Sequence, residues 1–405
     1  MKVGVSMTTK EKMAALGKKP SIIRQLYQYG LDRKKVIGNE NVFDFSLGNP
    51  NIPCPKEVTD KLVELITTND PVTLHGYSIG PGHPDIRNSI AEYLNKTYGT
   101  NEKGSLIYLT AGAAAGLAAC FNALLEKGEE VIVFAPFWPE YTVLVEKAEG
   151  VMRHVLCDLK TFMPDYDALE QTINEKTKFV IVNSPNNPTG VIYDETVIIK
   201  IAEILNKKQK EYNHPIYLLS DEPYRELIYN GCKYPFITNY YNNALVTYSF
   251  SKCISLPGER IGYVVVGRDC ENANFVYDCI KGAGRTLGYV CAPTLFQYLI
   301  PECQSYTADL NCYKENQEIL YNHLVKIGFE VAKPDGAFYL FVKALEDDSM
   351  KFSEEAKKFE LLLVPSDSFG LKGYVRIAYC VSKETVINSL PLFEKLYQYY
   401  KEKGE

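Results

Sequence analysis

The chain has 405 residues, of which 46% are hydrophobic and 23% charged, and its formal net charge at pH 7 is −6. This length exceeds what one simple core organises, so we expect a large domain with a smaller companion. The negative charge gives no electrostatic reason to expect nucleic acid or an anionic membrane as a partner, and no run of about 18 uncharged apolar residues indicates a membrane-spanning helix.

The amino terminus and the cysteines favour a cytoplasmic protein. The first residues, MKVGVSMTTKEKMAALGKK, lack an apolar run followed by a cleavage site, so no secretory signal is expected. The 11 cysteines are odd in number and contain no Cys-x-x-Cys pair, which favours reduced thiols over a disulfide framework. His154 and Cys157 have a metal-ligand-like spacing, but nothing nearby completes a zinc site. We therefore assign both to ordinary polar surface and predict no metal.

Short apolar, β-branched or aromatic runs recur through the first two thirds of the chain and predict strands. Their near-continuous apolar character is typical of strands buried on both faces of a mostly parallel sheet. Segments with helical spacing, such as 114–128 and 194–212, separate them. The predicted strands are residues 106–110, 131–134, 179–183, 216–220, 244–250 and 263–267. Together they predict an α/β three-layer sandwich over residues 48–295.

A long helical pattern at about 309–327 begins a second, smaller α+β unit, which we place at residues 296–405. It continues with strands at 337–342 and 374–379, a helix near 353–361 and a terminal helix. Residues 1–47 are expected to form an arm that packs against this small domain.

Polar, aromatic or glycine-rich features follow the carboxyl ends of five predicted strands. In open α/β sheets, ligands bind outside these ends at a topological switch point. In chain order the features are AGAAAG, APFWPEY with the only tryptophan, SPNNPTG, DEPY, and Lys252. Each alone has an ordinary explanation, such as a helix start, a core aromatic, a turn or a helix cap. Their convergence predicts one ligand site at this edge of the sheet.

The segment YSFSKCISLPGERIG, residues 248–262, places Ser249, Lys252 and Arg260 close together where few other charges occur. Burying Lys or Arg without a partner is costly, so a partner is expected in the protein or on a ligand. The small residues of AGAAAG would begin a helix whose first N–H groups lack internal partners, an arrangement suited to a phosphate.

From SLGNPNIPCP to YVRIAY, nearly the whole chain resembles the class I/II, aspartate-aminotransferase-like family of pyridoxal-phosphate enzymes of fold type I. The motif is Ser-x-x-Lys followed by Arg-x-Gly, present as Ser249, Lys252, Arg260 and Gly262, with NNPTG and DEPY upstream. The resemblance implies pyridoxal 5'-phosphate as cofactor. It also implies a ping-pong exchange of the amino group between an L-amino acid and a 2-oxo acid through a Schiff base on Lys252.

The resemblance implies a role for each matching residue around the cofactor ring. Lys252 matches the lysine that forms the Schiff base and then moves the proton. Asp221 matches the carboxylate that faces the pyridine nitrogen, which keeps the ring an electron sink. Tyr224 and Asn187 match the pair that hydrogen-bonds the ring hydroxyl, and Trp138 matches the aromatic side chain stacked on the ring.

The phosphate is implied to bind Ser249, Arg260 and the N–H groups of Gly112, Ala113 and Ala114. Many relatives have a side-chain donor in this last segment, so the backbone-only GAAA gives Arg260 more weight. Tyr77, in HGYSIGPG, matches a tyrosine that reaches the phosphate of the neighbouring subunit. It therefore implies a homodimer with shared active sites.

Three residues match substrate-binding positions of the family. Arg376, in YVRIAY, matches the arginine that grips the substrate α-carboxylate, and Gly48 matches the glycine against the same group. Arg285 lies in about the region where dicarboxylate-specific relatives have a cross-subunit arginine. We hypothesise that it selects aspartate or glutamate; the alternative is that Arg285 forms a structural salt bridge. If the substrate side chain is aromatic or aliphatic, Tyr27 and Phe45 near the amino-terminal arm would line its pocket instead.

Other functions fit the sequence less well. C–S β-lyases of the same fold often have histidine where this chain has Asn186 or Asn187, so transfer is favoured over β-elimination. A regulatory protein would need a DNA-binding domain, but about 45 residues without a helix-turn-helix pattern precede SLGNP. No Gly-x-Gly-x-x-Gly follows a predicted strand, which argues against a dinucleotide oxidoreductase.

Overall fold

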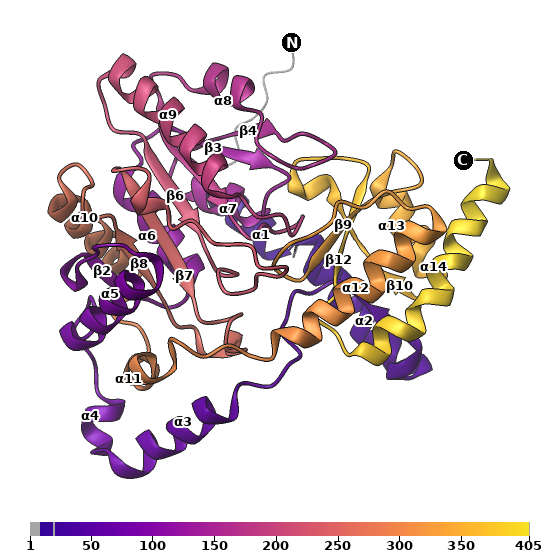
Figure 1. Ribbon diagram of the computed structural model, residues 1–405, viewed down its shortest axis with the longest axis horizontal. Coiled ribbons are helices and arrows are strands. Elements are labelled where there is room, and N and C mark those ends of the chain that lie inside the picture. Colours follow the sequence, from indigo (N-terminus) through magenta and orange to yellow (C-terminus); the bar gives the residue numbers. More distant parts are fainter. Residues whose placement is uncertain (1–8, 19–20, 405) are drawn as a thin grey trace.

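The computed structural model describes residues 9–18 and 21–404 and has a seven-stranded sheet at its centre (Figure 1). The strands are β2 (Ile107–Thr110), β3 (Glu130–Ala135), β4 (Val151–Leu156), β5 (Thr177–Asn183), β6 (Tyr217–Asp221), β7 (Ala244–Ser249) and β8 (Gly262–Val266). Their order is β2-β8-β7-β6-β5-β3-β4. Neighbours from β7 to β4 are parallel, whereas β8 is antiparallel to both β2 and β7. The predicted α/β class with a mostly parallel sheet is confirmed.

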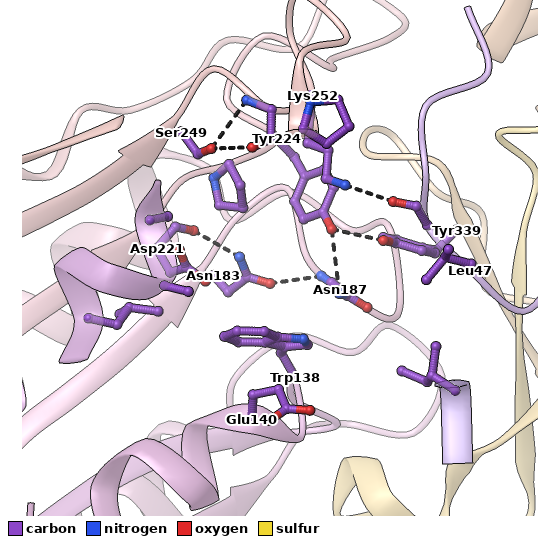
Figure 2. A pocket seen from close by; sticks show the side chains of 18 of the residues that line it. Leu47, Trp138, Glu140, Asn183, Asn187, Asp221, Tyr224, Ser249, Lys252 and Tyr339 are labelled. Carbon is purple, nitrogen blue, oxygen red and sulfur yellow. Dashed lines mark hydrogen bonds between the residues drawn. The ribbon is translucent and has the colours of Figure 1, made fainter. Parts of the chain in front are cut away.

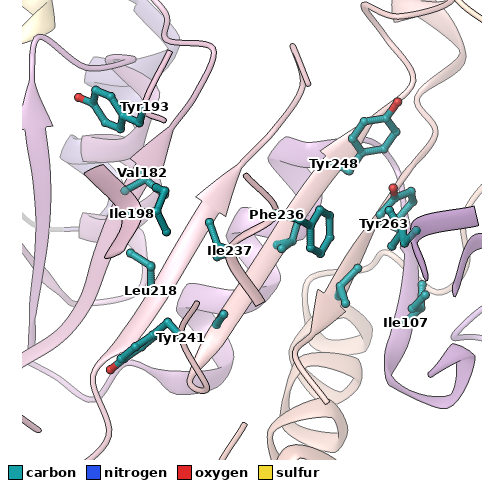
Figure 3. Packing of buried hydrophobic residues seen from close by; sticks show 14 of the residues in the cluster. Ile107, Val182, Tyr193, Ile198, Leu218, Phe236, Ile237, Tyr241, Tyr248 and Tyr263 are labelled. Atoms are coloured by element: carbon teal, nitrogen blue, oxygen red, sulfur yellow. The ribbon is translucent and has the colours of Figure 1, made fainter. Parts of the chain in front are cut away.

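Helices cover both faces of this sheet, because successive side chains of a strand point to opposite sides. The helices of this part are α3 (Lys56–Thr68), α4 (Pro71–His75), α5 (Pro84–Tyr98), α6 (Ala113–Leu124), α7 (Glu140–Lys147), α8 (Tyr166–Thr172), α9 (Glu195–Tyr212), α10 (Ala273–Thr286) and α11 (Thr294–Cys303). Ile107 and Leu109 pack in one core with residues of α5 and α9, and Figure 3 shows Ile198 and Leu218 within it. Tyr108, between them, packs in the opposite core with α6, α7 and α10. The result is a three-layer sandwich.

The carboxyl-terminal part contains smaller sheets covered by helices. Its strands are β9 (Tyr339–Lys343), β10 (Leu361–Leu362), β11 (Val364–Pro365) and β12 (Tyr374–Ala378), and its helices are α12 (Leu310–Ile327), α13 (Ser349–Lys357) and α14 (Lys383–Lys403). The order β11-β12-β9 is antiparallel. Phe338 and Phe393 belong to a third core between these elements.

Helix α13 begins and ends earlier than the predicted helix near 353–361. Its start is fixed by Asp348, whose side chain accepts hydrogen bonds from the backbone N–H groups of Met350 and Lys351. Its continuation is prevented because Leu361 and Leu362 pair in parallel with β1 (Phe43–Asp44). The hydrophobic pattern at 361–362 therefore belongs to a strand.

The amino-terminal helices are α1 (Thr9–Lys18) and α2 (Ile22–Ile37). Leu26 of α2 is buried against Leu362, Val364 and Phe369. Arg33 lies seven residues after Leu26, on the same side of α2, and forms an ion pair with Glu360. These contacts fix α2 against the carboxyl-terminal part, with its first turn beside the cavity described below.

Strand β4 is absent from the sequence prediction because it is an edge strand. Its only neighbour within the described residues is β3, and most of its side chains are exposed, so it lacks the apolar run of a buried strand. Cys157, which follows it, is buried rather than at a polar surface, and its Sγ lies 3.7 Å from the hydroxyl of Tyr193. The polar-surface assignment of Cys157 was wrong because a short stretch of sequence does not show what packs over it.

All 11 cysteines are free thiols. Within the described residues, no three His, Cys, Asp or Glu side chains are grouped so that they could bind a metal ion. Among the helices of the same part of the chain, none has the length and apolar character needed to cross a bilayer.

Candidate active site

The carboxyl ends of the central strands meet at one edge of the sheet. The strand register pairs Asn183 of β5 with Asp221 of β6, and Asp221 with Thr247 of β7. The antiparallel strand β8 begins at the same edge, since Gly262 pairs with both Ser249 and Thr110. The loop before β8 and the start of α6 therefore arrive beside the ends of β5, β6 and β7.

A cavity of about 630 Å³ opens at this edge, and Figure 2 shows many of its side chains. The predicted residues that line it are Gly48, Ala113, Ala114, Trp138, Asn187, Asp221, Tyr224, Ser249, Lys252, Arg260 and Arg376. Gly112 does not line it but adjoins Arg260. Tyr77 is 96% exposed and Arg285 is exposed in the last turn of α10, so neither lies in this chain's own cavity.

Lys252 presents a buried amine to the cavity. Its Nζ donates a hydrogen bond to the Gly48 carbonyl, with a distance of 2.7 Å, and no carboxylate pairs with it in the part of the chain described. Burial, with smaller contributions from the cations of Arg260 and Arg376, lowers the pKa of Lys252 to about 8. At pH 7 an amine with this pKa is about one tenth neutral, far more than one with a pKa of 10.5, and the neutral form is a nucleophile and a base.

Gly48 has to be glycine at this point. A Cβ at that position would lie 2.0 Å from the hydroxyl oxygen of Tyr339, which is closer than atoms can approach. The missing side chain lets the backbone carbonyl of Gly48 reach Lys252.

Asp221 is a fully buried carboxylate at the end of β6. It accepts hydrogen bonds from the Tyr141 hydroxyl at 2.6 Å and from the Thr247 hydroxyl at 3.3 Å. Burial raises the pKa of Asp221 to about 6, against the lowering effect of these two donors. Within the described residues it has no ion-pair partner, so a cationic group of a ligand would be stabilised beside it.

A chain of amide and phenol groups connects Asp221 to the middle of the cavity (Figure 2). Asn183 donates to the Asp221 carbonyl and accepts from the backbone N–H of Asn187. The Asn187 side chain lies 3.5 Å from the Tyr224 hydroxyl, which lies 2.8 Å from the hydroxyl of Tyr339. Asn187 and Tyr224 are thus held with polar atoms at the cavity surface.

Arg376, on β12, is a buried cation that also lines the cavity. Its Nη1 donates to Asn187 and its Nη2 to the carbonyl of Ser46, at 3.1 Å and 2.6 Å. Its Nε has no hydrogen-bond partner within the described residues although it is buried. The guanidinium lies over the rings of Tyr339 and Phe369, so it is fixed and still has an unsatisfied donor.

An anion cradle occupies the end of the cavity between β7 and α6. Among the residues that the structure describes, Arg260 contacts only uncharged acceptors, namely the Ser251 hydroxyl and the carbonyls of Pro257 and Ala111. The first N–H groups of α6 have no side-chain cap. Gly112 precedes the helix with φ of 82°, a left-handed conformation that favours glycine, and a Cβ there would lie 2.7 Å from Arg260. These donors fit a phosphate.

Several cavity residues are absent from the sequence prediction: Ser21, Ile23, Arg24, Leu117, Glu140, Asn183, Ser251 and Tyr339. Tyr141, which contacts Asp221, is also absent from it. Tyr27, considered for a side-chain pocket, does line the cavity, whereas Phe45 is fully buried 6.0 Å from the ring of Phe393. The assignment of Phe45 to a substrate pocket is therefore wrong.

We expect Lys252 of the ligand-free protein to be acetylated with a midpoint near pH 8. Only the neutral amine reacts, and at pH 8 an amine with a pKa of 10.5 is only about 0.3% neutral, against about half of one with a pKa near 8. The measurement is trace acetylation from about pH 6 to about pH 10, quantified by mass spectrometry, with the exposed Lys127 as reference. A Lys252 midpoint above about pH 10 would contradict the burial argument.

The site fits pyridoxal 5'-phosphate in each of its parts. It offers a reactive amine for the aldehyde, a buried carboxylate for the ring nitrogen, polar groups for the ring hydroxyl and a cradle for the phosphate. Such a site at the carboxyl edge of a mostly parallel sheet defines a pyridoxal-phosphate-dependent enzyme of fold type I.

Comparisons with known proteins identify the family. The family model "Aminotransferase class I and II" matches residues 40–390. The crystal structure of an amino transferase from Eubacterium rectale is 50% identical with a TM-score of 0.95, covering 98% of this chain and 100% of that chain. The aspartate aminotransferase of Pyrococcus horikoshii is 31% identical over 93% of this chain and 94% of its own length. The crystal structure of the Thermotoga maritima aspartate aminotransferase is 27% identical with a TM-score of 0.83, covering 93% and 97%. The chain belongs to the class I and II aminotransferases, and the predicted pyridoxal-phosphate-dependent transaminase is confirmed.

Proposed function

We propose that this aminotransferase exchanges an amino group between an L-amino acid with a short polar side chain and a 2-oxo acid, in a homodimer with shared active sites. The observation that supports this most is the grouping of Lys252, Asp221 and Arg376 around one cavity. When bound, the cofactor supplies an aldehyde that takes up the amino group and a ring that stabilises negative charge at the substrate Cα.

The cofactor would be held by residues from each side of the cavity. Asp221 would face the ring nitrogen, and the opposite charge there would lower the pKa of this carboxyl from its raised value. Asn187 and Tyr224 would donate to the ring hydroxyl, and Trp138 would stack on the ring. The phosphate would bind Ser249, Arg260 and the N–H groups of Gly112, Ala113 and Ala114.

Lys252 would hold the proton that leaves the substrate Cα and return it to the carbon on the other side of the amino nitrogen. A pKa near 8 suits this role, because an acid–base group works best when its pKa is close to the working pH. Arg376 would bind the α-carboxylate, satisfying its unpartnered Nε, with Gly48 beside the same group. The substrate Cα would thereby be positioned next to the lysine.

The homodimer is supported by an exposed apolar surface near Tyr77. Val72, Ile79 and Val290 are 80%, 50% and 63% exposed, and Tyr77 is 96% exposed. Exposed apolar side chains in this density are typical of an interaction surface. A second copy that covers them would let Tyr77 reach the partner's cofactor phosphate, as the sequence predicts. The free thiols support a reducing, cytoplasmic environment.

The relatives named as aspartate aminotransferases support a short polar donor. The hypothesis that Arg285 selects a side-chain carboxylate stays a prediction, because this exposed residue would act across the dimer. The C–S β-lyase alternative is not favoured, since the family and the relatives are aminotransferases.

We expect the purified protein to be yellow and its visible band to shift when single amino acids are added, with formation of the matching 2-oxo acid. Light scattering on the same sample should give twice the chain mass of 45.8 kDa. Release of pyruvate from cystathionine without amino transfer would instead indicate the lyase. A colourless protein that does not take up pyridoxal phosphate would refute the proposed function.

A further inference from the structure

Two charged side chains of the cavity have no role in the proposed function. The charged residues that line it are Arg24, Glu140, Asp221, Lys252, Arg260 and Arg376. The last four are assigned to cofactor and α-carboxylate. Arg24 and Glu140 have opposite charges, and neither forms a hydrogen bond or ion pair within residues 9–18 and 21–404.

No ion pair or hydrogen bond within the described residues explains a positive charge at Arg24. It lies in the first turn of α2, where the helix dipole disfavours a positive charge. The turn is nevertheless fixed over the cavity, because Leu26 is buried and Ser21, Ile23 and Tyr27 line the same space. Arg24 itself is exposed and lines the cavity, so its unpaired guanidinium is available to donate hydrogen bonds to a ligand there.

Glu140 is the first residue of α7, where the helix dipole stabilises its negative charge. It lies beside Trp138 in the cavity (Figure 2). The next residue, Tyr141, is fully buried and donates to Asp221, so the start of α7 is fixed relative to the cofactor site. Glu140 therefore offers a carboxylate acceptor at the cavity wall, on a helix start that is fixed.

The two charges together would discriminate between substrate side chains that reach both of them. A terminal carboxylate would be attracted by Arg24 and repelled by Glu140, and a terminal ammonium would meet the reverse. A carboxamide has both an acceptor oxygen and an N–H₂ donor, so it alone among these groups satisfies both residues without a like charge.

We infer that the side-chain subsite between Arg24 and Glu140 recognises a terminal carboxamide, so that asparagine or glutamine is the preferred amino donor. Arg24 donates to the amide oxygen, and Glu140 accepts from the amide nitrogen. The inference rests on the proposed function and departs from the hypothesis that Arg285 selects a dicarboxylate.

The test is the half-reaction of the holoenzyme with one donor at a time, followed by the visible band, because it needs no acceptor. The donors are asparagine, glutamine, aspartate, glutamate, ornithine, phenylalanine and alanine. We expect the second-order rate constant for the better amide to exceed that of its matching acid by at least about tenfold, because a site built for hydrogen bonds rejects a mismatched group.

Matched variants separate the two contacts. Glu140→Gln, which keeps size and removes charge, should lower the amide-to-acid ratio by at least about tenfold by admitting the acid. Arg24→Gln should lower the rate with the amides by at least about tenfold while changing the rate with alanine by less than about twofold. Lys35→Gln removes a charge from α2 outside the cavity and should change none of these rates. An unaltered cofactor band and melting temperature verify that each variant is folded.

An acid, ornithine or phenylalanine as best donor would overturn the inference. The inference would also be overturned if Glu140→Gln left the amide-to-acid ratio of rate constants unchanged. It would be overturned as well if Arg285→Ala lost activity on polar donors and Arg24→Gln did not. If no donor shifts the band, the proposed function itself fails. If donors react without an amide preference, only this inference fails.

Discussion

Lys252→Ala is expected to lower the rate of transamination by about 10⁴-fold or more, the largest effect of any substitution in the cavity. The substitution removes the amine that attaches the cofactor and the group that moves the proton at the substrate Cα. No other lysine lines the cavity, so within the described residues no second amine replaces it. The measurement is single-turnover 2-oxo acid formation together with the visible spectrum.

The loss should come from chemistry and not from unfolding. Burial lowers the pKa of Lys252, so the folded state is penalised when this amine is protonated. Because the folded pKa lies below the unfolded value of 10.5, stability from this group is lowest below about pH 8 and increases up to about pH 10.5. Removing the amine should therefore not lower the melting temperature of the apoenzyme at pH 7. Lys127→Ala, an exposed control, should retain full activity; residual activity of Lys252→Ala above about 1% would contradict its assignment.

The residues of the cofactor site could be predicted from the sequence because burying charged and polar side chains without a partner costs free energy. A lysine and an arginine within residues 248–262 need a partner, and the strand ends at residues 183 and 221 bring polar groups to the same edge. The parallel strands β3, β5, β6 and β7 are buried along almost their whole length and read as apolar runs, which explains why the sequence predicts these four.

Contacts made by distant segments could not be predicted in the same way. Tyr141 reaches Asp221 across 80 positions, and Tyr339 reaches Tyr224 across 115 positions. Both are among 30 tyrosines, and nothing in their local sequence distinguishes them. Arg24 enters the cavity only because α2 packs through Leu26 on the carboxyl-terminal part, a contact that no local pattern encodes.

The antiparallel direction of β8 is also invisible in its sequence. Its residues, Gly262–Val266, are as apolar as those of the parallel strands. Direction is set by the connection, because residues 250–261 form turns and the 3-10 helix Pro257–Glu259 without a crossover helix, and return the chain beside β7. This return places Arg260 at the cavity, so the deviation from parallel order contributes to the anion cradle.

Arg376→Ala is expected to lower kcat/KM by about 10³-fold, mainly through KM. The guanidinium is buried, fixed by Asn187 and the Ser46 carbonyl, and has a donor left over at Nε. Loss of one partner of a buried charged pair costs about 2–5 kcal/mol of binding free energy, and a decrease in kcat/KM of about 10³-fold lies within that cost. Arg376→Lys retains the charge but not the two-pronged geometry, so a loss of about tenfold to 10²-fold is expected.

Arg376 could bind the α-carboxylate or have a structural role only. The KM values of the amino acid and of the 2-oxo acid, measured separately, distinguish these two roles. Amino acid and 2-oxo acid share the carboxylate next to the reacting carbon, whatever their side chains. If Arg376 binds that group, KM for both substrates rises in parallel, and the cofactor band of the resting enzyme is unchanged. Arg153→Ala, which breaks a peripheral ion pair with Glu130, should change neither KM. A lower melting temperature with unaltered KM values would show that Arg376 only holds Ser46 and Asn187 in place, and a rise in only one KM would assign it to a side chain instead of the α-carboxylate.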